Sequence, residues 1–397
     1  MPQPDISVND TDFHADPYSY YARLRAAGPV HHVEVSASEY APTLLVVGYE
    51  EARQALNHPG LSKDWRSSAV LPGIAATAAN SNMLETDPPQ HTRLRRLVAR
   101  EFTTRRVQAM RPRVQQITDE LLDGMAARPE RSADLVKALA FPLPITVIGE
   151  LLGVPHLDRE RFSYWSKEVL APTSVTPSTT AHQTLSEYLA ELVDAKAKDP
   201  GEDLLSALIR TSDEDGDALS ATELIGMAFL LLIAGHETTV NLISNGTRAL
   251  LAHPDQLADL RADYDGLLDG AIEEMLRYDG PVQNSTYRYA REDMEIGGTA
   301  VPAGATVLIS LAGADRDPGR YENPDAFDIR RAPQGHLAFG HGLHFCIGAP
   351  LARMEGAIAF RGLLERFPDL AEDPAGDPPS WIGGSLIRGV TRLPVRW

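Results

Sequence analysis

The chain has 397 residues, and its 37 lysines and arginines stand against 55 aspartates and glutamates, which gives a formal net charge of −18 at pH 7. This charge excludes functions that need a basic surface, so neither nucleic acid nor an anionic membrane is an expected partner. Hydrophobic residues make up 43% of the chain, enough for a large core. A single cysteine and an N-terminus without a basic or long apolar stretch predict a cytoplasmic protein.

The first eighty residues predict two short helices, a strand and a loop. Asp16 stands before a proline, which is typical of a helix start. Residues 44–47 are apolar and predict a strand, and a second helix follows through Ala55. Residues 66–82 are rich in alanine, serine and asparagine and predict an irregular loop.

A helix with two cationic faces is predicted from Asp87 onward, where an acidic residue and prolines mark its start. His91 and Arg95 lie within about 40° of each other, one turn apart. The helix is either a solvated basic helix, or it points His91 and Arg95 inward to the carboxylates of a ligand. In the second case, the arginines on the roughly opposite face would meet an acidic partner: Arg93, Arg96 and Arg100.

Two more helices are predicted over residues 105–127 and 142–170. Residues 171–180 then interrupt the helical pattern with prolines, serines and threonines. Because helical patterns resume beyond this interruption, it is either a linker between domains or a mobile lid over a site.

The longest helical pattern runs from Ser220 to Leu251. Ser220 and Glu223 form a capping box at its start. Residues 224–234 are almost wholly apolar, but this stretch is too short to span a bilayer. The sequence therefore predicts a long helix that packs in the protein core.

This long helix changes from apolar to polar at its middle, in the sequence AGHETT from Ala234 to Thr239. Gly235 in a helix interior costs about 1 kcal/mol relative to alanine, which suggests that another group approaches there. A threonine hydroxyl can also take over a backbone hydrogen bond and bend a helix. The pattern indicates either a buried helix with a polar bend or residues that take part in chemistry.

A shorter helix and a small β region follow. Residues 269–278 predict the helix, on which Glu274 and Arg277 are neighbours three residues apart. Strands are predicted over residues 294–298, where the strand ends in a Gly-Gly turn, and over residues 307–311.

The only cysteine, Cys346, lies in the sequence FGHGLHFCIG from Phe339 to Gly348. Three glycines let this backbone turn tightly and approach a flat partner. The residues after it predict a helix, so Cys346 would lie just before a helix N-terminus, which favours a thiolate. Zinc or an iron–sulfur cluster would need further cysteines. The remaining alternatives are an inert buried cysteine, a cysteine hydrolase and a haem ligand.

The pattern F-x-x-G-x-H-x-C-x-G is filled by Phe339, Gly342, His344, Cys346 and Gly348. It resembles the haem-binding loop of cytochrome P450 monooxygenases, and other motifs of that family occur in the family's order over nearly the whole chain. The resemblance implies the P450 fold, which is mainly α-helical with small β-sheets and has the form of a triangular prism. The haem would lie between the long central helix and the helix after Cys346.

The resemblance also implies one haem-thiolate domain over residues 1–397. Its β-rich part would comprise residues 30–60, 285–330 and 380–397, and its helical part would comprise residues 85–280 and 346–366.

The cofactor implied by the resemblance is haem b, which is iron protoporphyrin IX, with Cys346 as the axial ligand of the iron. His91, Arg95, Arg288 and His344 match positions that bind the haem propionates in this family. The full set of residues that match haem-binding positions is His91, Arg95, Ala234, Arg288, Phe339, His344, Cys346 and Gly348.

Two further pairs match family motifs. Glu237 and Thr238 match the acid–alcohol pair that delivers protons during oxygen activation. Glu274 and Arg277 match the buried E-x-x-R pair that supports the fold. The family usually adds an arginine from a downstream motif, but Ala326 stands at that position, and Arg330 is a candidate substitute.

The whole sequence is similar to actinomycete enzymes that hydroxylate or epoxidise macrolides and other polyketides. Glu85 matches an acidic position that meets an amino sugar in some of them, whereas residues 71–79 contain no acid for a second anchor. Residues 381–389 predict a turn that dips into the substrate pocket in this family. The expected substrate contacts are Leu84, Glu85, Asn284 and Ile382.

The chain has no flavin or nicotinamide fingerprint, because Phe345 stands where a third glycine would be needed after Gly340 and Gly342. The resemblance therefore implies a separate ferredoxin and ferredoxin reductase as partners of a monomeric enzyme. A peroxide-driven peroxygenase and a non-enzymatic haem sensor or carrier are the alternatives. The acid–alcohol pair argues against the peroxygenase.

Overall fold

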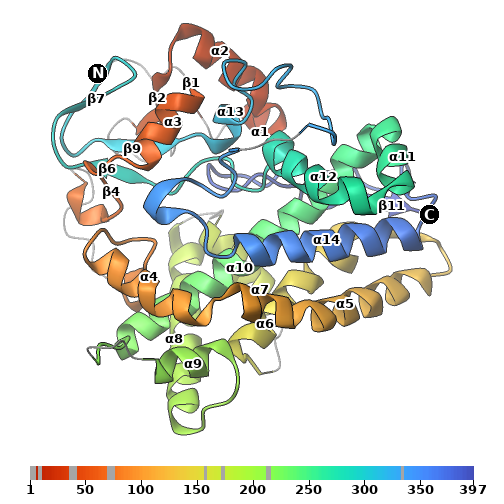
Figure 1. Cartoon of the computed structure of the whole chain (residues 1–397), viewed down its shortest axis with the longest axis horizontal. Coiled ribbons are helices and arrows are strands. Elements are labelled where there is room, and N and C mark those ends of the chain that lie inside the picture. The colour runs from red at the N-terminus through yellow and green to blue at the C-terminus, as the bar shows by residue number, and fades with distance from the viewer. Residues whose placement is uncertain are drawn as a thin grey trace. The chain divides into compact units, whose positions relative to one another are not determined.

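The computed structural model describes residues 6–7, 11–34, 43–68, 77–155, 159–170, 175–211, 216–331 and 335–397 (Figure 1). The chain divides into two compact units, each made of separate stretches of sequence. The sheet unit comprises residues 1–74, 245–346 and 380–391. The helical unit comprises residues 75–244, 347–379 and 392–397.

The two units differ from the β-rich and helical parts that the sequence predicted at Cys346, which was expected in the helical part but belongs to the sheet unit, and in two longer stretches. Residues 245–280 were expected in the helical part but belong to the sheet unit. Residues 392–397 were expected in the β-rich part but belong to the helical unit, where they contribute a strand to a small sheet. The single domain over residues 1–397 stays a prediction.

The sheet unit is built on a six-stranded mixed sheet in the order β1-β2-β3-β9-β6-β4. Its two central strands are parallel, with Leu45 opposite Leu308. Leu44 and Leu45 point to opposite faces of the sheet, and a separate apolar cluster covers each face. The strands are β1 (Ile6–Ser7), β2 (Val30–Glu34), β3 (Thr43–Val46), β4 (Leu61–Ser62), β6 (Arg288–Ala290) and β9 (Thr306–Ile309).

Two helices of the sheet unit, α2 and α12, begin at an aspartate cap. The carboxylate of Asp16 accepts a hydrogen bond from the amide of Ser19 at 3.3 Å, and Asp263 does the same for Gly266 at 2.9 Å. The helices are α1 (Thr11–Ala15), α2 (Pro17–Ala27), α3 (Tyr49–Leu56), α11 (Pro254–Ala262), α12 (Tyr264–Asp279) and α13 (Leu311–Ala314), with short 3-10 turns at Trp65–Ser67 and Gly342–His344. The helix predicted over 269–278 is thus confirmed, but it begins five residues earlier.

The strand predicted over 294–298 is confirmed as β7 (Met294–Ile296), and Gly297 and Gly298 form the predicted turn after it. The turn leads into β8 (Thr299–Val301), which the sequence did not predict, and the two strands form a hairpin. Both glycines have positive φ, 54° and 79°, which a two-residue hairpin turn requires. The strand predicted over 307–311 is too long, because β9 ends at Ile309. The hydroxyl of Ser310 accepts a hydrogen bond from the amide of Gly313 at 2.9 Å and starts α13 instead.

The helical unit packs its helices around one large apolar cluster. In Figure 1 the orange α5 and the blue α14 run side by side, and they share the largest interface between helices. The helices are α4 (Gln90–Glu101), α5 (Thr104–Ala126), α6 (Pro142–Leu152), α7 (Arg159–Leu170), α8 (Val175–Lys198), α9 (Leu204–Arg210) and α14 (Ala349–Arg366), with a π-helical turn at Val136–Ala140 and a 3-10 turn at Ala78–Asn80. A small sheet joins β5 (Ser132–Asp134), β10 (Ala371–Glu372) and β11 (Pro394–Arg396).

Two predictions for this unit need correction. The helix predicted over 142–170 is two helices, because Gly153 adopts φ +68°, a left-handed conformation that ends α6. The predicted interruption at 171–180 is shorter, because α8 begins at Val175. Residues 171–174, and residues 69–76 of the predicted loop, lie outside the described residues.

The long helix α10 (Ala221–Ala252) is confirmed, and it contributes to both units. Its capping box is present, with the carboxylate of Glu223 accepting from the amide of Ser220 at 2.8 Å. Within the described residues it is the one helix long and apolar enough to cross a membrane, but 67% of its most apolar window is buried inside the protein. This burial is typical of a core helix.

Candidate functional site

The loop that carries Cys346 is a tight turn in the sheet unit. The amide of Cys346 donates a hydrogen bond to the carbonyl oxygen of Phe339 at 2.9 Å, which closes the loop. Gly340 and Gly342 both have φ +73°, a conformation that other residues rarely adopt. A Cβ atom at Gly342 would also lie 2.4 Å from Oδ1 of Asn57. The glycine pattern therefore follows from the path of the backbone.

This loop presents apolar groups and a thiol to the outside. Cys346 is exposed, and the side chains of Leu343 and Phe345 are 53% and 41% exposed. Covering large exposed apolar side chains with an apolar partner lowers the free energy of the system. In sequence, α14 begins three residues after Cys346, with Gly348 at its N-cap position. The loop is thus suited to hold a flat apolar group against sulfur.

Two other residues predicted to bind haem belong to the same unit. Arg288 is the first residue of β6 and is only 5% exposed, and its partner across the sheet is Val307 on β9. His344 ends the 3-10 turn before Cys346 and is half-buried. The sheet thus fixes the position of Arg288, and the loop fixes that of His344.

Hydrogen bonds tie together two segments of the sheet unit that are far apart in the sequence. The amide of Gln283 donates to the carbonyl oxygen of Leu386 at 2.8 Å, and the Asn284 side-chain amide donates to Ser385 at 2.5 Å. Asn284 has no exposed surface, and through this bond it positions the turn at 381–389. The sequence had predicted that Asn284 itself contacts the substrate. Ile382 lies on this turn and is half-buried.

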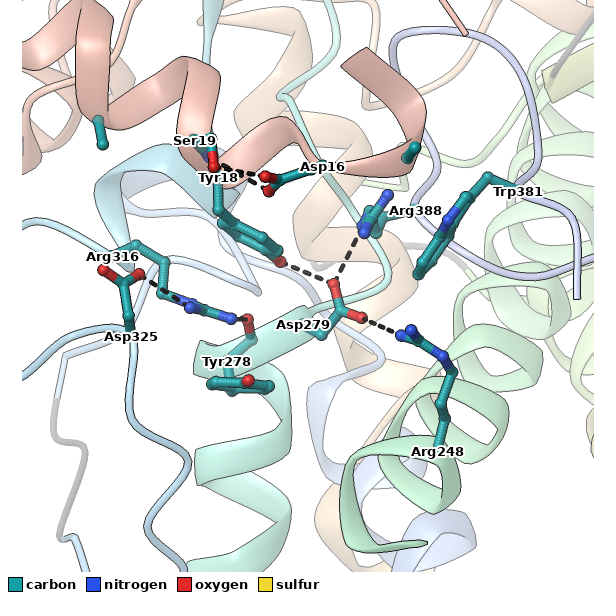
Figure 2. Close-up of a pocket in the computed structure, with 12 residues that line it drawn as sticks. Asp16, Tyr18, Ser19, Arg248, Tyr278, Asp279, Arg316, Asp325, Trp381 and Arg388 are labelled. Carbon is teal, nitrogen blue, oxygen red and sulfur yellow. Dashed lines mark hydrogen bonds and ion pairs between the residues drawn. The ribbon is translucent and has the colours of Figure 1, made fainter. Parts of the chain in front are cut away.

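The same turn also borders a polar cavity of about 400 Å³ in the sheet unit (Figure 2). Figure 2 shows Asp279, the last residue of α12, at the centre of its network. Its carboxylate accepts from Oη of Tyr18 at 2.7 Å and from Nε of Arg388 at 3.0 Å, and it lies 3.9 Å from Nη1 of Arg248. The Arg388 guanidinium stacks on Trp381 at 3.5 Å. This network around Asp279, the Asp279 junction, therefore holds the turn at 381–389.

In the helical unit, His91 on α4 is 1% exposed. Burial lowers the pKa of His91, and the positive charge of Arg95 lowers it further. A neutral imidazole at pH 7 keeps one N–H that can donate to a carboxylate. His91 and Arg95 thus combine a neutral donor with a cation one turn apart.

The prediction that Arg93 faces an acidic partner protein is wrong. Its Nε lies 2.6 Å from Oδ2 of Asp217, and its Nη1 lies 2.6 Å from Oε1 of Glu223. The two carboxylates raise the pKa of the Arg93 guanidinium. Arg93 therefore ties α4 to the start of α10. Arg96 and Arg100 are exposed on α4.

The middle of α10 is the part of this helix that is open. Ala234 is exposed and Thr238 is half-buried, one turn apart, while most residues around them are buried. The hydroxyl of Thr238 donates to the carbonyl oxygen of Ala234 at 3.0 Å, as a bending threonine does. Ile148 of α6 approaches Gly235, where a Cβ atom would lie 2.8 Å from Cδ1 of Ile148. The group that needs Gly235 is thus a packed side chain.

Glu237, beside Thr238, is 5% exposed. Within the described part of the chain, its Oε1 atom has no hydrogen-bond partner. A buried carboxylate oxygen in this state is costly, so it indicates a functional position.

Leu84 and Glu85 lie in the segment before α4, and both are half-buried. Oε2 of Glu85 accepts a hydrogen bond from Nδ2 of the Asn80 side chain at 2.8 Å, and the backbone amide of Leu84 donates to Oδ1 of Asn82 at 2.8 Å. These bonds hold the segment in one conformation.

Glu274 and Arg277 form a buried ion pair on α12, with N···O distances of 2.7 and 2.8 Å. The third member of this cluster is Arg331, whose Nε lies 3.3 Å from Oε1 of Glu274. Arg330, which the sequence suggested for this role, pairs with Asp259 on the surface at 3.0 Å instead. The two neighbouring arginines could not be distinguished from the motif alone.

A model of the cytochrome P450 family matches residues 11–167 and 172–387. The cytochrome P450 monooxygenase PikC of Streptomyces venezuelae is 57% identical over 393 residues, which cover 99% of this chain and 94% of PikC. The chain belongs to the cytochrome P450 family. The 6-deoxyerythronolide B hydroxylase of Saccharopolyspora erythraea is 44% identical over 406 residues, with 99% of this P450 and 98% of that protein covered.

Solved P450 structures agree with this assignment. The tirandamycin C-bound P450 monooxygenase TamI has 45% sequence identity and a TM-score of 0.89, with 98% of this chain and 99% of that chain covered. The predicted fold, mainly α-helical with small β-sheets, is thus confirmed. As a cytochrome P450, the protein is a monooxygenase, and its family implies a haem cofactor.

The residues of this P450 fit a haem. The loop offers an exposed thiol and, just before it in the sequence, two exposed apolar side chains, and its glycines let the backbone approach a flat ring. The exposed position of Ala234 leaves room against an otherwise buried helix. Thiolate is one of the axial ligands that haem proteins use.

Proposed function

We propose that this P450 carries haem b, with Cys346 as the axial ligand, and inserts one oxygen atom of O₂ into a C–H bond of a bulky, largely apolar polyketide such as a macrolide. Hydroxylation is the main reaction, and epoxidation would add the oxygen atom to a C=C bond of the same class of substrate. The observation that carries the proposal is the exposed Cys346 thiol on a glycine turn, with the exposed side chains of Leu343 and Phe345 just before it in the sequence.

When bound, the haem supplies the activation of dioxygen, which a thiolate ligand promotes by donating electron density. The chain supplies the binding groups. Cys346 would ligate the iron, and His91, Arg95, Arg288 and His344 would bind the propionates. Paired charges offset the cost of taking propionates out of water. The remaining haem contacts in the proposal are Ala234, Phe339 and Gly348.

Glu237 and Thr238 would deliver the protons that oxygen activation consumes. In the structure, the Thr238 hydroxyl donates to the carbonyl oxygen of Ala234 at 3.0 Å, and rotation about its side-chain bond frees it to hold a water molecule. Glu237 is the acid that can pass a proton to that water from its carboxyl group. The two residues thus form a short relay on α10.

The substrate class is supported by the names of the relatives. 6-Deoxyerythronolide B hydroxylase and TamI with bound tirandamycin C are named for the compounds that they act on or bind. By analogy, Leu84 and Ile382 would contact an apolar polyketide, and Glu85 would pair with an amine. Asn284 would act by holding the turn that carries Ile382.

Ferredoxin and a ferredoxin reductase would supply the electrons to a monomeric enzyme in the cytoplasm. The exposed Arg96 and Arg100 on α4 are the arginines that would meet the acidic ferredoxin. Arg93 is not part of this surface, because Asp217 and Glu223 hold it.

A panel of macrolides and other polyketides tests the proposal. Binding is measured as the change of the haem spectrum when a ligand displaces the iron-bound water. Turnover is then measured with ferredoxin, its reductase, NADPH and isotopically labelled dioxygen. We expect a product with one labelled oxygen atom. Turnover that needs peroxide and gains nothing from ferredoxin would instead identify a peroxygenase.

The variant Glu85→Gln tests the amine contact. We expect its dissociation constant for macrolides with an amino sugar to rise about tenfold, because a charge-assisted hydrogen bond is lost. The matched control is the neutral aglycone of the same macrolide, whose affinity should not change. Equal losses for both ligands would show that Glu85 acts only on the local structure.

A further inference from the structure

His236, on α10 next to Glu237, is fully buried in the helical unit. Its Nδ1 atom lies 2.6 Å from the carbonyl oxygen of Leu232, one turn earlier in the helix. A carbonyl oxygen only accepts hydrogen bonds, so Nδ1 must carry a hydrogen. The state of the other ring nitrogen, Nε2, is then decided by what surrounds it.

Nε2 of His236 meets a serine and a carboxylate. It lies 2.9 Å from Oγ of Ser166 on α7 and 3.4 Å from Oε1 of Glu237. Oγ of Ser166 also lies 2.8 Å from the carbonyl oxygen of Phe162. Phe141 packs its ring edge to face against the imidazole at 6.0 Å. The imidazole of His236 and the carboxylate of Glu237 are therefore enclosed by protein groups.

Counting hydrogens separates two states of this cluster. If the imidazole is neutral, Nε2 is an acceptor, and the single hydroxyl hydrogen of Ser166 can serve either Nε2 or Phe162, but not both. Oε1 of Glu237 then faces the lone pair of Nε2 at 3.4 Å, with no hydrogen between the two atoms. If Nε2 carries a hydrogen, it donates to Ser166, its positive charge lies 3.4 Å from Oε1 of Glu237, and the serine hydroxyl is free to donate to Phe162. The second state therefore lets Ser166 serve both of its neighbours and gives the Glu237 carboxylate a cation beside it.

We propose that His236 is a positively charged imidazolium that stores a proton for Glu237, and that it is an additional member of the proton relay. The inference rests on the proposed role of Glu237 and Thr238. In each transfer, the proton leaves Nε2 of His236 and joins Oε1 of Glu237. The carboxyl group of Glu237 then passes its proton to the water that Thr238 holds, and the Ser166 hydroxyl turns from Phe162 to donate to Nε2. One proton from solvent later returns to Nε2 and restores the ion pair.

The ion pair also offsets the cost of burying the Glu237 carboxylate. An isolated buried carboxylate is strongly disfavoured, whereas a neighbouring cation stabilises it. The imidazole also links α10 to α7, since Ser166 belongs to that helix. His236 is therefore both a proton store and a positioning residue for Glu237.

Nuclear magnetic resonance of the ferrous carbon monoxide complex, labelled with ¹⁵N-histidine, tests the charge of His236 directly. This complex is diamagnetic, and the variant His236→Gln identifies the signal by its loss. We expect hydrogens on both ring nitrogens at pH 7. A single protonated ring nitrogen would overturn the proposal.

Two variants show whether the carboxylate holds the proton. In Glu237→Gln the imidazole should lose its second hydrogen, because the compensating charge is gone. In Ser166→Ala both ring nitrogens should stay protonated, because Glu237 still faces Nε2. Loss of the second hydrogen in Ser166→Ala, with retention in Glu237→Gln, would contradict the assignment.

Turnover supplies a second readout. In His236→Gln we expect product formation to fall about tenfold, while more of the electrons end in hydrogen peroxide, as expected of a weakened general acid. The matched control is His182→Gln. His182 is a half-buried histidine that stacks on Phe229 of α10 at 5.3 Å and should leave this ratio unchanged. The carbonyl spectrum tests Cys346 separately, so a normal spectrum with a neutral His236 would overturn this inference alone.

Discussion

A buried carboxyl group makes the stability of the sheet unit depend on pH. Asp315 is 1% exposed, and its Oδ1 accepts a hydrogen bond from the amide of Leu337 at 2.7 Å. Burial raises the pKa of Asp315 from 3.8 to about 7, although the positive charges of His336, Arg277 and Arg316 lower it. The native protein therefore binds a proton at Asp315 that the unfolded chain has already released at pH 5 to 7.

The variant Asp315→Asn should remove this pH dependence. The stability from the raised pKa is present below the unfolded value of 3.8 and is lost as the pH rises to about 7. Relative to the parent, the free energy of unfolding of the variant should thus rise by about 2 kcal/mol between pH 5 and pH 8. Urea unfolding at both pH values measures this change. A constant difference between the two proteins would contradict the assignment.

Arg331 and Arg330 are neighbours with different expected contributions. Arg331 meets the buried carboxylate of Glu274 and donates to the carbonyl of Glu322 at 2.7 Å, so Arg331→Ala should destabilise the protein by about 2 kcal/mol. Arg330 pairs with Asp259 while both are about half exposed, so Arg330→Ala should cost less than about 0.5 kcal/mol. Thermal unfolding of the two variants compares them. Equal losses would show that the motif cluster does not depend on Arg331.

Sequence reasoning at this scale worked where a local motif specifies a residue and failed where a partner lies far along the chain. The glycines around Cys346 follow from backbone turns, which a motif records. Arg331 and the buried position of Asn284 depend on segments that only folding brings together. His236 lay inside a recognised motif, but its contact with Ser166 on another helix left no signal in the sequence.

The elements of the fold were predictable where their ends carry a cap. Ser220 and Glu223 start α10, and Asp16 starts α2, as the sequence indicated. The break between α6 and α7 was missed, although Gly153 marks it, because apolar spacing continues on both sides. The short strand β5 was not predicted, since Ser132–Asp134 has little β character and is a strand only because β11 pairs with it.

Three helix glycines should respond differently to alanine. At Gly226 a Cβ atom would lie 2.4 Å from the carbonyl oxygen of Ser81, which is backbone and cannot move easily, so Gly226→Ala should cost about 2 kcal/mol or more. At Gly235 the obstacle is the flexible end of Ile148, so the cost should be smaller. At Gly124 nothing lies within 4 Å, and alanine should stabilise α5 by up to about 1 kcal/mol.

Thermal unfolding of these three variants gives the order directly. The midpoint should fall most for Gly226→Ala, fall less for Gly235→Ala, and rise for Gly124→Ala. The double variant Gly235→Ala with Ile148→Val should recover part of the loss at Gly235, because it shortens the obstructing side chain. A stabilising Gly226→Ala would show that the 3-10 turn at Ala78–Asn80 does not pack on α10 as described.

Across the whole molecule, folding brings together residues that lie far apart in the sequence and that no local pattern connects. The composition and charge limited the class of partner, and the motifs identified the family, its fold and its cofactor ligand. The junction at Asp279 joins Tyr18, 261 positions earlier, to Arg388, 109 positions later. No local pattern predicted it, because each residue alone resembles an ordinary surface residue.

The junction itself gives a prediction for the sheet unit. Asp279→Asn leaves Arg388 buried without its carboxylate, so it should destabilise the protein by about 3 kcal/mol. It should also weaken substrate binding, because Arg388 lies at the end of the turn that carries Ile382. The matched control is Asp325→Asn, since Asp325 pairs with Arg316 but is 73% exposed and should cost less than about 1 kcal/mol. Similar losses in both variants would contradict the central role of Asp279.

The bond between the thiolate of Cys346 and haem iron is the central claim. The spectrum of the reduced protein with carbon monoxide measures it most directly, because thiolate ligation shifts the main absorption band to the red. We expect that shifted band in the parent protein and its loss in Cys346→Ser. A parent protein that binds no haem, or a shifted band that persists in Cys346→Ser, would contradict the account.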